Sequence, residues 1–165
     1  MAEIVPLDRV PVAAVEDLLD RAFGADRRTR PAYALREGTC AIPALSFAAV
    51  DMDGALLGTL QSWPVKIADE PLVMIGPVAV EPGIQRSGIG QMLMRAVLKA
   101  ASDTDAPPLM MIGDPEYYGR FFGFTAEGTA GWELDGPVER RRLLVRARFL
   151  QNVPQHGRIL PDPTR

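Results

Sequence analysis

The sequence predicts a single α/β (α+β) domain in which a mixed central sheet carries helices on both faces. Three segments lead to this prediction. Residues 45–65 hold two apolar stretches joined by a hairpin signal, residues 72–101 read as a strand, a glycine-rich turn and an amphipathic helix, and residues 109–112 form a short apolar stretch. The last two segments make a strand–helix–strand unit, which we expect to be a right-handed parallel crossover.

Length and composition indicate one globular domain. The chain has 165 residues, and 47% of them are hydrophobic, which is enough for a full core. A net charge of −3 is not the basic footprint of a nucleic-acid-binding protein. The chain shows no signal-peptide pattern and no apolar run near the ~20 residues that span a bilayer. We therefore expect a cytoplasmic protein that binds neither nucleic acid nor a membrane, with Cys40 as a small buried side chain.

The N-terminal part of the chain predicts two helices. Apolar residues recur at helical spacing within residues 7–23, and Gly24 then stops the helix. Pro31 can begin a short second helix that Gly38 closes. We expect these helices to precede the sheet hairpin.

Strands dominate the middle of the chain. Two of them, at residues 45–50 and 56–65, flank Asp53-Gly54, a dipeptide typical of tight hairpins. The strand at 72–80 contains Pro77, which lacks the N–H that a sheet ladder needs. We therefore expect a bulge or bend near Gly76-Pro77, or else an edge strand that tolerates the proline.

The C-terminal third should complete the domain. A helix is expected at residues 115–121, followed by two strands at 131–134 and 142–146. Beyond Phe149 the composition turns to proline, glycine and polar residues, so we expect an extended or loosely packed tail. This places the domain at residues 2–148 and the tail at residues 149–165.

Two glycines, Gly88 and Gly90, stand where the helix after the turn begins. Glycine costs about 1 kcal/mol relative to alanine in a helix. A helix start presents unpaired N–H groups and the positive end of its dipole, and missing side chains would let an anion approach them. A plain loop with a helix cap is the alternative interpretation.

Two better-known phosphate loops do not fit this turn. A Walker loop needs a lysine and a hydroxyl residue where Ile89 and Gly90 stand. A dinucleotide fingerprint needs a third glycine where Leu93 stands. Both interpretations are excluded.

The turn resembles the acyl-CoA loop of the GNAT N-acetyltransferase superfamily, whose pattern Gln/Arg-x-x-Gly-x-Gly/Ala is matched by Gln85, Gly88 and Gly90. A second segment, Gly-Asp-Pro-Glu-Tyr-Tyr-Gly-Arg-Phe-Phe-Gly-Phe at 113–124, resembles a bacterial subgroup of predicted N-acetyltransferases. The resemblance implies the GNAT acyl-CoA N-acyltransferase fold, in which the central strand pair is splayed. It also implies acetyl-CoA as co-substrate, and the sequence shows no metal-ligand cluster.

The resemblance assigns the acetyl-CoA contacts to two stretches. Backbone groups of Val78, Ala79 and Val80 would receive the pantetheine arm, and a backbone N–H there could polarise the thioester carbonyl. Arg86 would add a salt-sensitive contact, or is equally a surface arginine. The pyrophosphate would rest on the loop residues Gln85, Arg86, Ser87, Gly88, Ile89, Gly90 and Gln91.

Acyl transfer from a thioester needs a proton donor for the departing thiolate. In this superfamily a tyrosine after the fifth strand usually serves, and the matching residue is Tyr118. One residue more than usual separates the tyrosine pair from the final Gly-Phe, which keeps Tyr117 as an alternative; both tyrosines could also be packing aromatics. Asp114 is either a general base or a helix cap, and His156 is expected to be an exposed bystander.

The acceptor is a primary amine of a small molecule or peptide, if the resemblance holds, and acetyl transfer would proceed by direct attack in a ternary complex. The alternative is a catalytically silent acyl-CoA-binding sensor or regulatory module. A homodimer is possible for such folds. Two sets of side chains could line the acceptor region. The first consists of Arg27, Arg28 and Arg30, which could instead be a solvated run of charges. The second consists of Phe23, Tyr33 and Trp63, which could instead be core aromatics.

Overall fold

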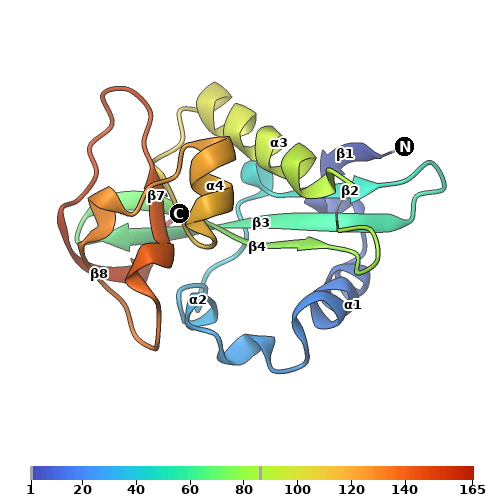
Figure 1. Cartoon of the computed structure of the whole chain (residues 1–165), viewed down its shortest axis with the longest axis horizontal. Helices are drawn as coiled ribbons and strands as arrows, with labels where there is room; N and C mark the ends of the chain where they lie inside the picture. Colours follow the sequence, from blue (N-terminus) through green and yellow to red (C-terminus); the bar gives the residue numbers. More distant parts are fainter. Residues whose placement is uncertain (1, 86) are drawn as a thin grey trace. The chain divides into compact units, whose positions relative to one another are not determined.

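The computed structural model describes residues 2–85 and 87–165, and the chain forms two compact units. Two long strands, β3 (Leu56–Ile67) and β4 (Glu70–Val80), both labelled in Figure 1, contribute residues to both units. The first unit consists of the described residues of Met1–Thr29, Ala41–Ser62 and Pro77–Thr104, and the second of Arg30–Cys40, Trp63–Gly76 and Asp105–Arg165.

Eight strands pair into a mixed sheet, which confirms the predicted fold class. The shorter strands are β1 (Glu3–Pro6), β2 (Phe47–Val50), β5 (Leu109–Ile112), β6 (Gly131–Glu133), β7 (Leu143–Arg146) and β8 (His156–Pro161). The main order is β1-β2-β3-β4-β5-β7, and β8 pairs with both β3 and β6. The β4–β5 and β6–β8 pairs are parallel, and the β4–β5 pair confirms the predicted parallel crossover partners.

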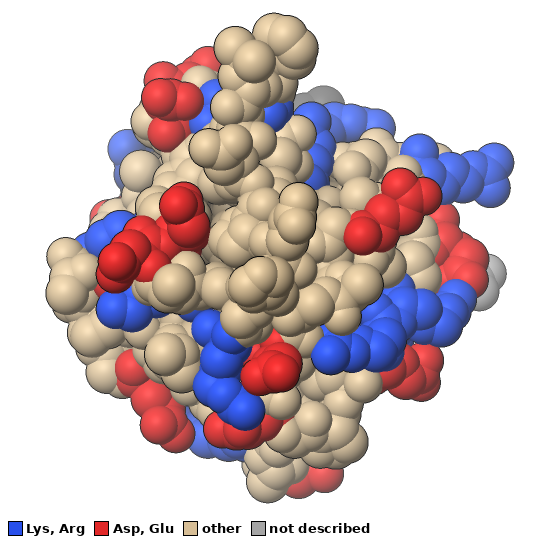
Figure 2. Space-filling model, turned by 90° about the vertical axis from the view of Figure 1, so that its left-hand side faces the viewer, with Lys and Arg blue, Asp and Glu red and all other residues tan. Residues whose placement is uncertain are grey.

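Four α-helices accompany the strands: α1 (Val12–Phe23), α2 (Pro31–Ala34), α3 (Ile89–Asp103) and α4 (Pro115–Phe122). Single 3-10 turns occur at η1 (Leu7–Arg9), η2 (Arg27–Thr29), η3 (Pro43–Leu45), η4 (Glu127–Thr129) and η5 (Arg140–Arg142). No helix among the described residues is both long and apolar enough to cross a membrane. On the face drawn in Figure 2, acidic and basic side chains are interspersed among uncharged ones.

In the first unit, α1 and α3 cover opposite faces of the strands (Figure 1). Val15, Leu18 and Leu19 of α1 form a core cluster with Ala79 of β4. The helix stops at Gly24, whose φ of 93° suits glycine and whose N–H donates to the Asp20 carbonyl. The helix begins at Val12 rather than at residue 7, because residues 7–9 form η1 before it.

The predicted hairpin between β2 and β3 is confirmed, and its turn is closed by a side chain. The Asp51 carboxylate accepts from the N–H groups of Asp53 and Ala55, each at 2.9 Å, and Gly54 has a φ of 83°. An aspartate that binds the backbone two residues on, followed by a residue at positive φ, is typical turn chemistry. The local sequence therefore suffices to specify this turn.

The second unit contains the strand pair around β5. This strand pairs with β7 over its whole length, from Leu109 to Ile112. Its pairing with β4 covers only Val73–Leu109 and Met74–Met110. Met111 and Ile112 therefore have β7 on one side and no recorded β4 partner on the other within the described residues, as a splayed strand pair requires.

Of the two expectations for the tail, extended or loosely packed, the structure agrees with the first and contradicts the second over residues 156–161. Residues 156–161 form β8, which pairs with Val65–Ile67 of β3 and with β6. Ile159 is buried, and the Arg165 guanidinium donates to the carbonyls of Val65 and Leu72. His156, which opens β8, is exposed, as expected. The polar composition concealed the strand because alternate residues of β8 remain exposed.

One further expectation fails: Cys40 is exposed instead of buried and lies in an irregular stretch between α2 and η3. β1 was not predicted, and it pairs with β2, about 45 residues later in the chain. Neither segment carries a local signal that would have revealed its environment.

Candidate functional site

The glycine-rich turn joins β4 to α3 through two tight steps. The Glu81 N–H donates to the Leu57 carbonyl at 2.8 Å, and the Ile84 N–H donates back to the Glu81 carbonyl at 3.1 Å. Both the N–H and the hydroxyl of Ser87 donate to the Ile84 carbonyl. Several N–H and hydroxyl groups of the turn before Gly88 are therefore engaged in hydrogen bonds within the turn.

The start of α3 is open for an anion. Gly88 is the N-cap, with a φ of 86°, and no side chain caps the helix. The first intrahelical bond runs from the Met92 N–H to the Gly88 carbonyl at 3.0 Å, so the N–H groups of Ile89, Gly90 and Gln91 precede the helical ladder. A Cβ built on Gly88 would meet nothing within 4 Å. This helix start can accept a pyrophosphate, which the positive end of the helix dipole would favour.

The other loop residues predicted to bind the cofactor differ in their exposure to solvent. Gln85 and Ser87 are exposed, whereas Ile89 is buried and can offer only its backbone. Arg86 lies outside the described residues. The prediction for these side chains stays a prediction.

An ion pair that the sequence analysis missed fixes the beginning of the turn to α1. Arg21 donates from Nε and Nη2 to the two carboxylate oxygens of Glu81, at 3.1 and 2.8 Å. Two parallel bonds of this kind fix the geometry better than a single contact does. The two residues are 60 positions apart, so only the fold brings them together.

The predicted irregularity of β4 lies at Gly76. This residue has a φ of 138°, a region that favours glycine, and its carbonyl accepts from Trp63 Nε1 at 2.9 Å. The strand nevertheless continues through Pro77 to Val80. Of the three residues predicted to face the pantetheine arm, Ala79 is buried, while Val78 and Val80 are half-buried.

Tyr118 is held from the N-terminal end of α4. Asp114 caps this helix by accepting from the Glu116 N–H at 3.0 Å, and its carbonyl accepts from the Tyr118 N–H at 2.8 Å. The ring of Tyr118 lies so close to Gly113 that a Cβ on that glycine would come within 2.8 Å of it. Cap and glycine together fix where the tyrosine stands.

Burial sets the protonation of this tyrosine. Desolvation raises the pKa of Tyr118 to about 12; neighbouring Tyr117 and Asp114 act in the same direction, and Arg142 opposes them. The phenol therefore keeps its proton at neutral pH. By contrast, hydrogen bonding with Glu116 holds the pKa of Asp114 below its ordinary value, which suits a cap and makes this carboxylate a weak base.

The additional phenylalanine is accommodated at the far end of α4. Gly123 ends the helix with a φ of 75°, and the Phe124 N–H reaches back six residues to the Tyr118 carbonyl at 3.3 Å. Phe121 points outward and is 51% exposed, whereas Phe122 and Phe124 are buried. The insertion thus lies beyond the cap and the tyrosine pair. Tyr117 packs edge-on against Tyr118, with ring centroids 4.9 Å apart.

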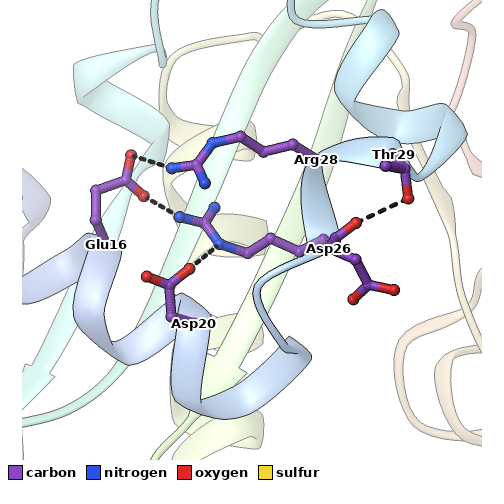
Figure 3. A network of polar contacts seen from close by, with 6 residues as sticks. Glu16, Asp20, Asp26, Arg28 and Thr29 are labelled. Carbon is purple, nitrogen blue, oxygen red and sulfur yellow. Dashed lines mark hydrogen bonds and ion pairs between the residues drawn. The ribbon is translucent and has the colours of Figure 1, made fainter.

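The arginines after α1 are not all solvated. The Arg27 guanidinium donates to two carboxylates of α1, to Glu16 at 2.8 Å and to Asp20 at 2.9 Å. Figure 3 shows these two carboxylates, which point from α1 toward the segment that holds Arg28. The Arg27 side chain is 1% exposed, so the expectation of a solvated charge is wrong for Arg27. Arg28 is more than half exposed and approaches Glu16 only at 3.8 Å. Arg27 therefore holds η2 against α1.

Two of the aromatic residues that could wall an acceptor pocket hold an arginine that the sequence analysis missed. The Arg36 guanidinium carbon lies 3.9 Å from the ring centroid of Trp63 and 4.3 Å from that of Tyr33. Such stacking is a cation–π contact. It places a positive charge beside Trp63, whose Nε1 donates to the Gly76 carbonyl.

No group of residues suited to a metal ion occurs among the described residues.

Comparison with known proteins agrees with this geometry. The profile of the acetyltransferase (GNAT) family matches residues 12–124. An uncharacterized N-acetyltransferase, YhbS of Escherichia coli K12, is 27% identical over 119 residues, which cover 71% of this chain and 68% of YhbS.

Solved structures share the fold. The structure of E. coli YhbS in complex with CoA superimposes with a TM-score of 0.74 at 22% identity, covering 98% of this chain and 89% of the other. A GNAT family acetyltransferase from Brucella melitensis in complex with acetyl-CoA has a TM-score of 0.66 at 27% identity, covering 98% and 96%. The chain is therefore a member of the acetyltransferase (GNAT) family and, within it, is YhbS-like.

Proposed function

We propose that this protein transfers an acetyl group from acetyl-CoA to a primary amine of a small molecule or peptide, by direct attack in a ternary complex. Membership of the family supports the reaction class, and two structurally similar proteins were solved with CoA or acetyl-CoA. The observation that carries the proposal is the uncapped start of α3 at Gly88, with open space where a side chain would stand.

The pyrophosphate of the co-substrate fits this helix start. The N–H groups of Ile89, Gly90 and Gln91 would donate to it, and the exposed Gln85 would add a side-chain contact, whereas the Ser87 hydroxyl already donates to the Ile84 carbonyl. Hydrogen bonds to charged groups contribute about 1.5–3 kcal/mol each, so a few of them account for micromolar affinity. Arg86 would add a salt-sensitive contact, which remains a prediction from the sequence alone.

The backbone of Val78, Ala79 and Val80 would hold the pantetheine arm and orient the thioester. A backbone N–H of this stretch would donate to the thioester carbonyl oxygen as negative charge develops on it. Acetyl-CoA supplies the acetyl group that the amine takes. The irregular backbone at Gly76, just before this stretch, supports a role for β4 other than plain pairing.

Tyr118 would donate its phenolic hydrogen to the departing sulfur. With a pKa of about 12 the phenol is protonated at every physiological pH. A thiol has an ordinary pKa of about 8.5, so complete proton transfer from this phenol would run uphill. We therefore assign Tyr118 a hydrogen bond to the developing thiolate, with the final proton coming from the attacking nitrogen.

The alternative function is a catalytically silent acyl-CoA-binding module. One observation favours it: Asp114, the carboxylate considered as a general base, has a lowered pKa and caps α4. Such a module would bind acetyl-CoA as tightly as an enzyme would, without turnover. The two functions therefore differ in kinetics and not in binding.

Two measurements separate these possibilities. Calorimetry with CoA tests the binding site, and we expect a dissociation constant in the micromolar range. A free-thiol release assay with acetyl-CoA and a panel of amines, amino acids and peptides tests the reaction. Binding without release for any amine would favour the silent module, and no binding at all would refute both.

A further inference from the structure

Two polar atoms of β3 are buried without a hydrogen-bond partner among the described residues: Thr59 Oγ1 and Gln61 Oε1. Thr59 is 0% exposed and Gln61 is 9% exposed. The neighbouring Ser62 differs, because its hydroxyl donates to the Leu45 carbonyl at 2.6 Å. Unpartnered buried polar groups are rare in native proteins, and each calls for an explanation.

Both side chains lie on the same face of the strand, because successive residues of a strand alternate. The residue before Thr59 faces α3, because a Cβ on Gly58 would come within 2.9 Å of Ile89 and 3.2 Å of Leu93. Thr59 and Gln61 therefore point to the opposite face of the first unit. That is the face covered by α1 (Figure 1).

The two atoms also lie beside the stretch of β4 proposed to hold the thioester. The Glu81 N–H donates to the Leu57 carbonyl, and a Cβ on Gly58 would lie 2.9 Å from the Ala79 carbonyl oxygen. The part of β3 that leads into Thr59 and Gln61 is therefore in contact with the end of β4. Ala79 belongs to the core cluster of α1, the helix that covers the face deduced for Thr59.

We propose that Thr59 Oγ1 and Gln61 Oε1 accept hydrogen bonds from the amino group of the acceptor. This inference rests on the proposed function, from which the class of acceptor comes, and it names the residues that recognise the amine. A primary amine brings N–H donors, which are what an unpartnered carbonyl and hydroxyl oxygen lack.

Neutral partners also suit the chemistry. A carboxylate beside the amine would favour the ammonium form, which has no lone pair for attack. An amide and a hydroxyl bind the N–H groups without that electrostatic bias, and burial lowers the pKa of an amine. A site of this kind would thus select the amine and deliver it as a nucleophile.

Direct binding can be followed at the side chain itself. In ¹⁵N-labelled protein saturated with CoA, the Gln61 side-chain amide signal is identified by its loss in Gln61→Met. We expect n-butylammonium to shift this signal, and butyltrimethylammonium, which has no N–H, to leave it in place. A signal that moves with both ions, or with neither, would overturn the proposal.

Nearly isosteric apolar variants test the consequence for affinity. Gln61→Met and Thr59→Val should each weaken the binding of n-butylammonium about tenfold, the effect of one lost hydrogen bond. Thermal stability should be unchanged or higher, because an unpartnered polar atom is removed. Thr104→Val is the matched control, since that hydroxyl only donates to the Ala100 carbonyl at an exposed helix end.

These outcomes separate this inference from the proposed function. Calorimetry of CoA binding to each variant should give the wild-type dissociation constant, even where the binding of n-butylammonium is weakened. Variants that are more stable and bind n-butylammonium as the wild type does would show that the two atoms are only a packing defect. Loss of CoA binding in the wild type would instead refute the proposed function.

Discussion

Gly113 lies against the ring of Tyr118, and no other residue fits there: a Cβ would stand 2.8 Å from Tyr118 Cε2 and 2.9 Å from Cδ2. Gly113→Ala should therefore displace the phenol while leaving α4 capped by Asp114. A misplacement of about 1 Å can lower a rate up to roughly 100-fold, and we expect at least a tenfold loss of kcat in the thiol-release assay. In a Tyr118→Phe background the same change should have no further effect.

Tyr118→Phe removes only the hydroxyl. Turnover should fall by about 10²-fold or more, the usual cost of removing one preorganised hydrogen-bond donor to a developing negative charge. The dissociation constant of CoA, measured by calorimetry, should stay the same. Tyr117→Phe is the matched control, because its ring packs against Tyr118 at 4.9 Å in the same helix. If Tyr117→Phe is the slower variant, the hydrogen bond to the thiolate is assigned to Tyr117 instead.

The buried phenol should also make the protein sensitive to alkali. The pKa of Tyr118 is raised from 10.0 to about 12, so the folded state holds this proton more tightly than the unfolded state does. Stability is unaffected below pH 10 and falls as the pH rises from 10 to 12, by up to about 2–3 kcal/mol. Urea titrations at pH 9 and 11.5 should show a smaller difference for Tyr118→Phe than for the wild type.

Gly88→Leu tests the anion site, and the chain supplies its control. Gly88 and Gly54 have φ values of 86° and 83°, and a Cβ on either would meet nothing within 4 Å. A leucine should therefore strain both backbones alike, by about 1–2 kcal/mol. Only Gly88→Leu should weaken CoA binding, by about tenfold or more in calorimetry. Equal losses in both variants would mean that stability, and not the site, was affected.

Arg27→Met should destabilise the fold. The arginine is 1% exposed, but Glu16 and Asp20 are 40% and 47% exposed and can return to water. We therefore expect a loss of about 1–3 kcal/mol in denaturant titrations, below the 3–5 kcal/mol of a fully buried pair. Arg27→Lys should recover only part of it, because one ammonium does not reproduce the bonds from Nε and Nη2. If Arg27→Met has the free energy of unfolding of the wild type, Arg27 does not stabilise the fold.

Local signals predicted much of this fold. The hairpin turn at Asp53-Gly54, the buried strand at 109–112 and the cap at Asp114 follow from short-range chemistry, and all occur where expected. The family motif likewise led to the helix start at Gly88. What these features share is that the residues which define them are neighbours in the chain.

The rest depends on contacts between residues that are not neighbours in the sequence. Arg27 was expected to be solvated because its two carboxylate partners lie 7 and 11 residues earlier, on α1, and only the fold of that segment brings them together. The Arg21–Glu81 pair and the stacking of Arg36 on Trp63 depend on contacts between still more distant parts of the chain. The unpartnered oxygens of Thr59 and Gln61 are visible only once the strand is packed.

The C-terminal strand has a practical consequence for anyone who would trim this protein to its family motif. β8 is the strand that β6 pairs with, and it covers Val65–Ile67 at an edge of β3. Gly157 of β8 approaches Ile67 so closely that a Cβ would meet its side chain at 2.5 Å. Truncation after residue 148 would expose an unpaired, apolar edge of β3. Exposed edges of this kind tend to pair with strands of other molecules. The shortened protein should precipitate or self-associate where the full chain does not.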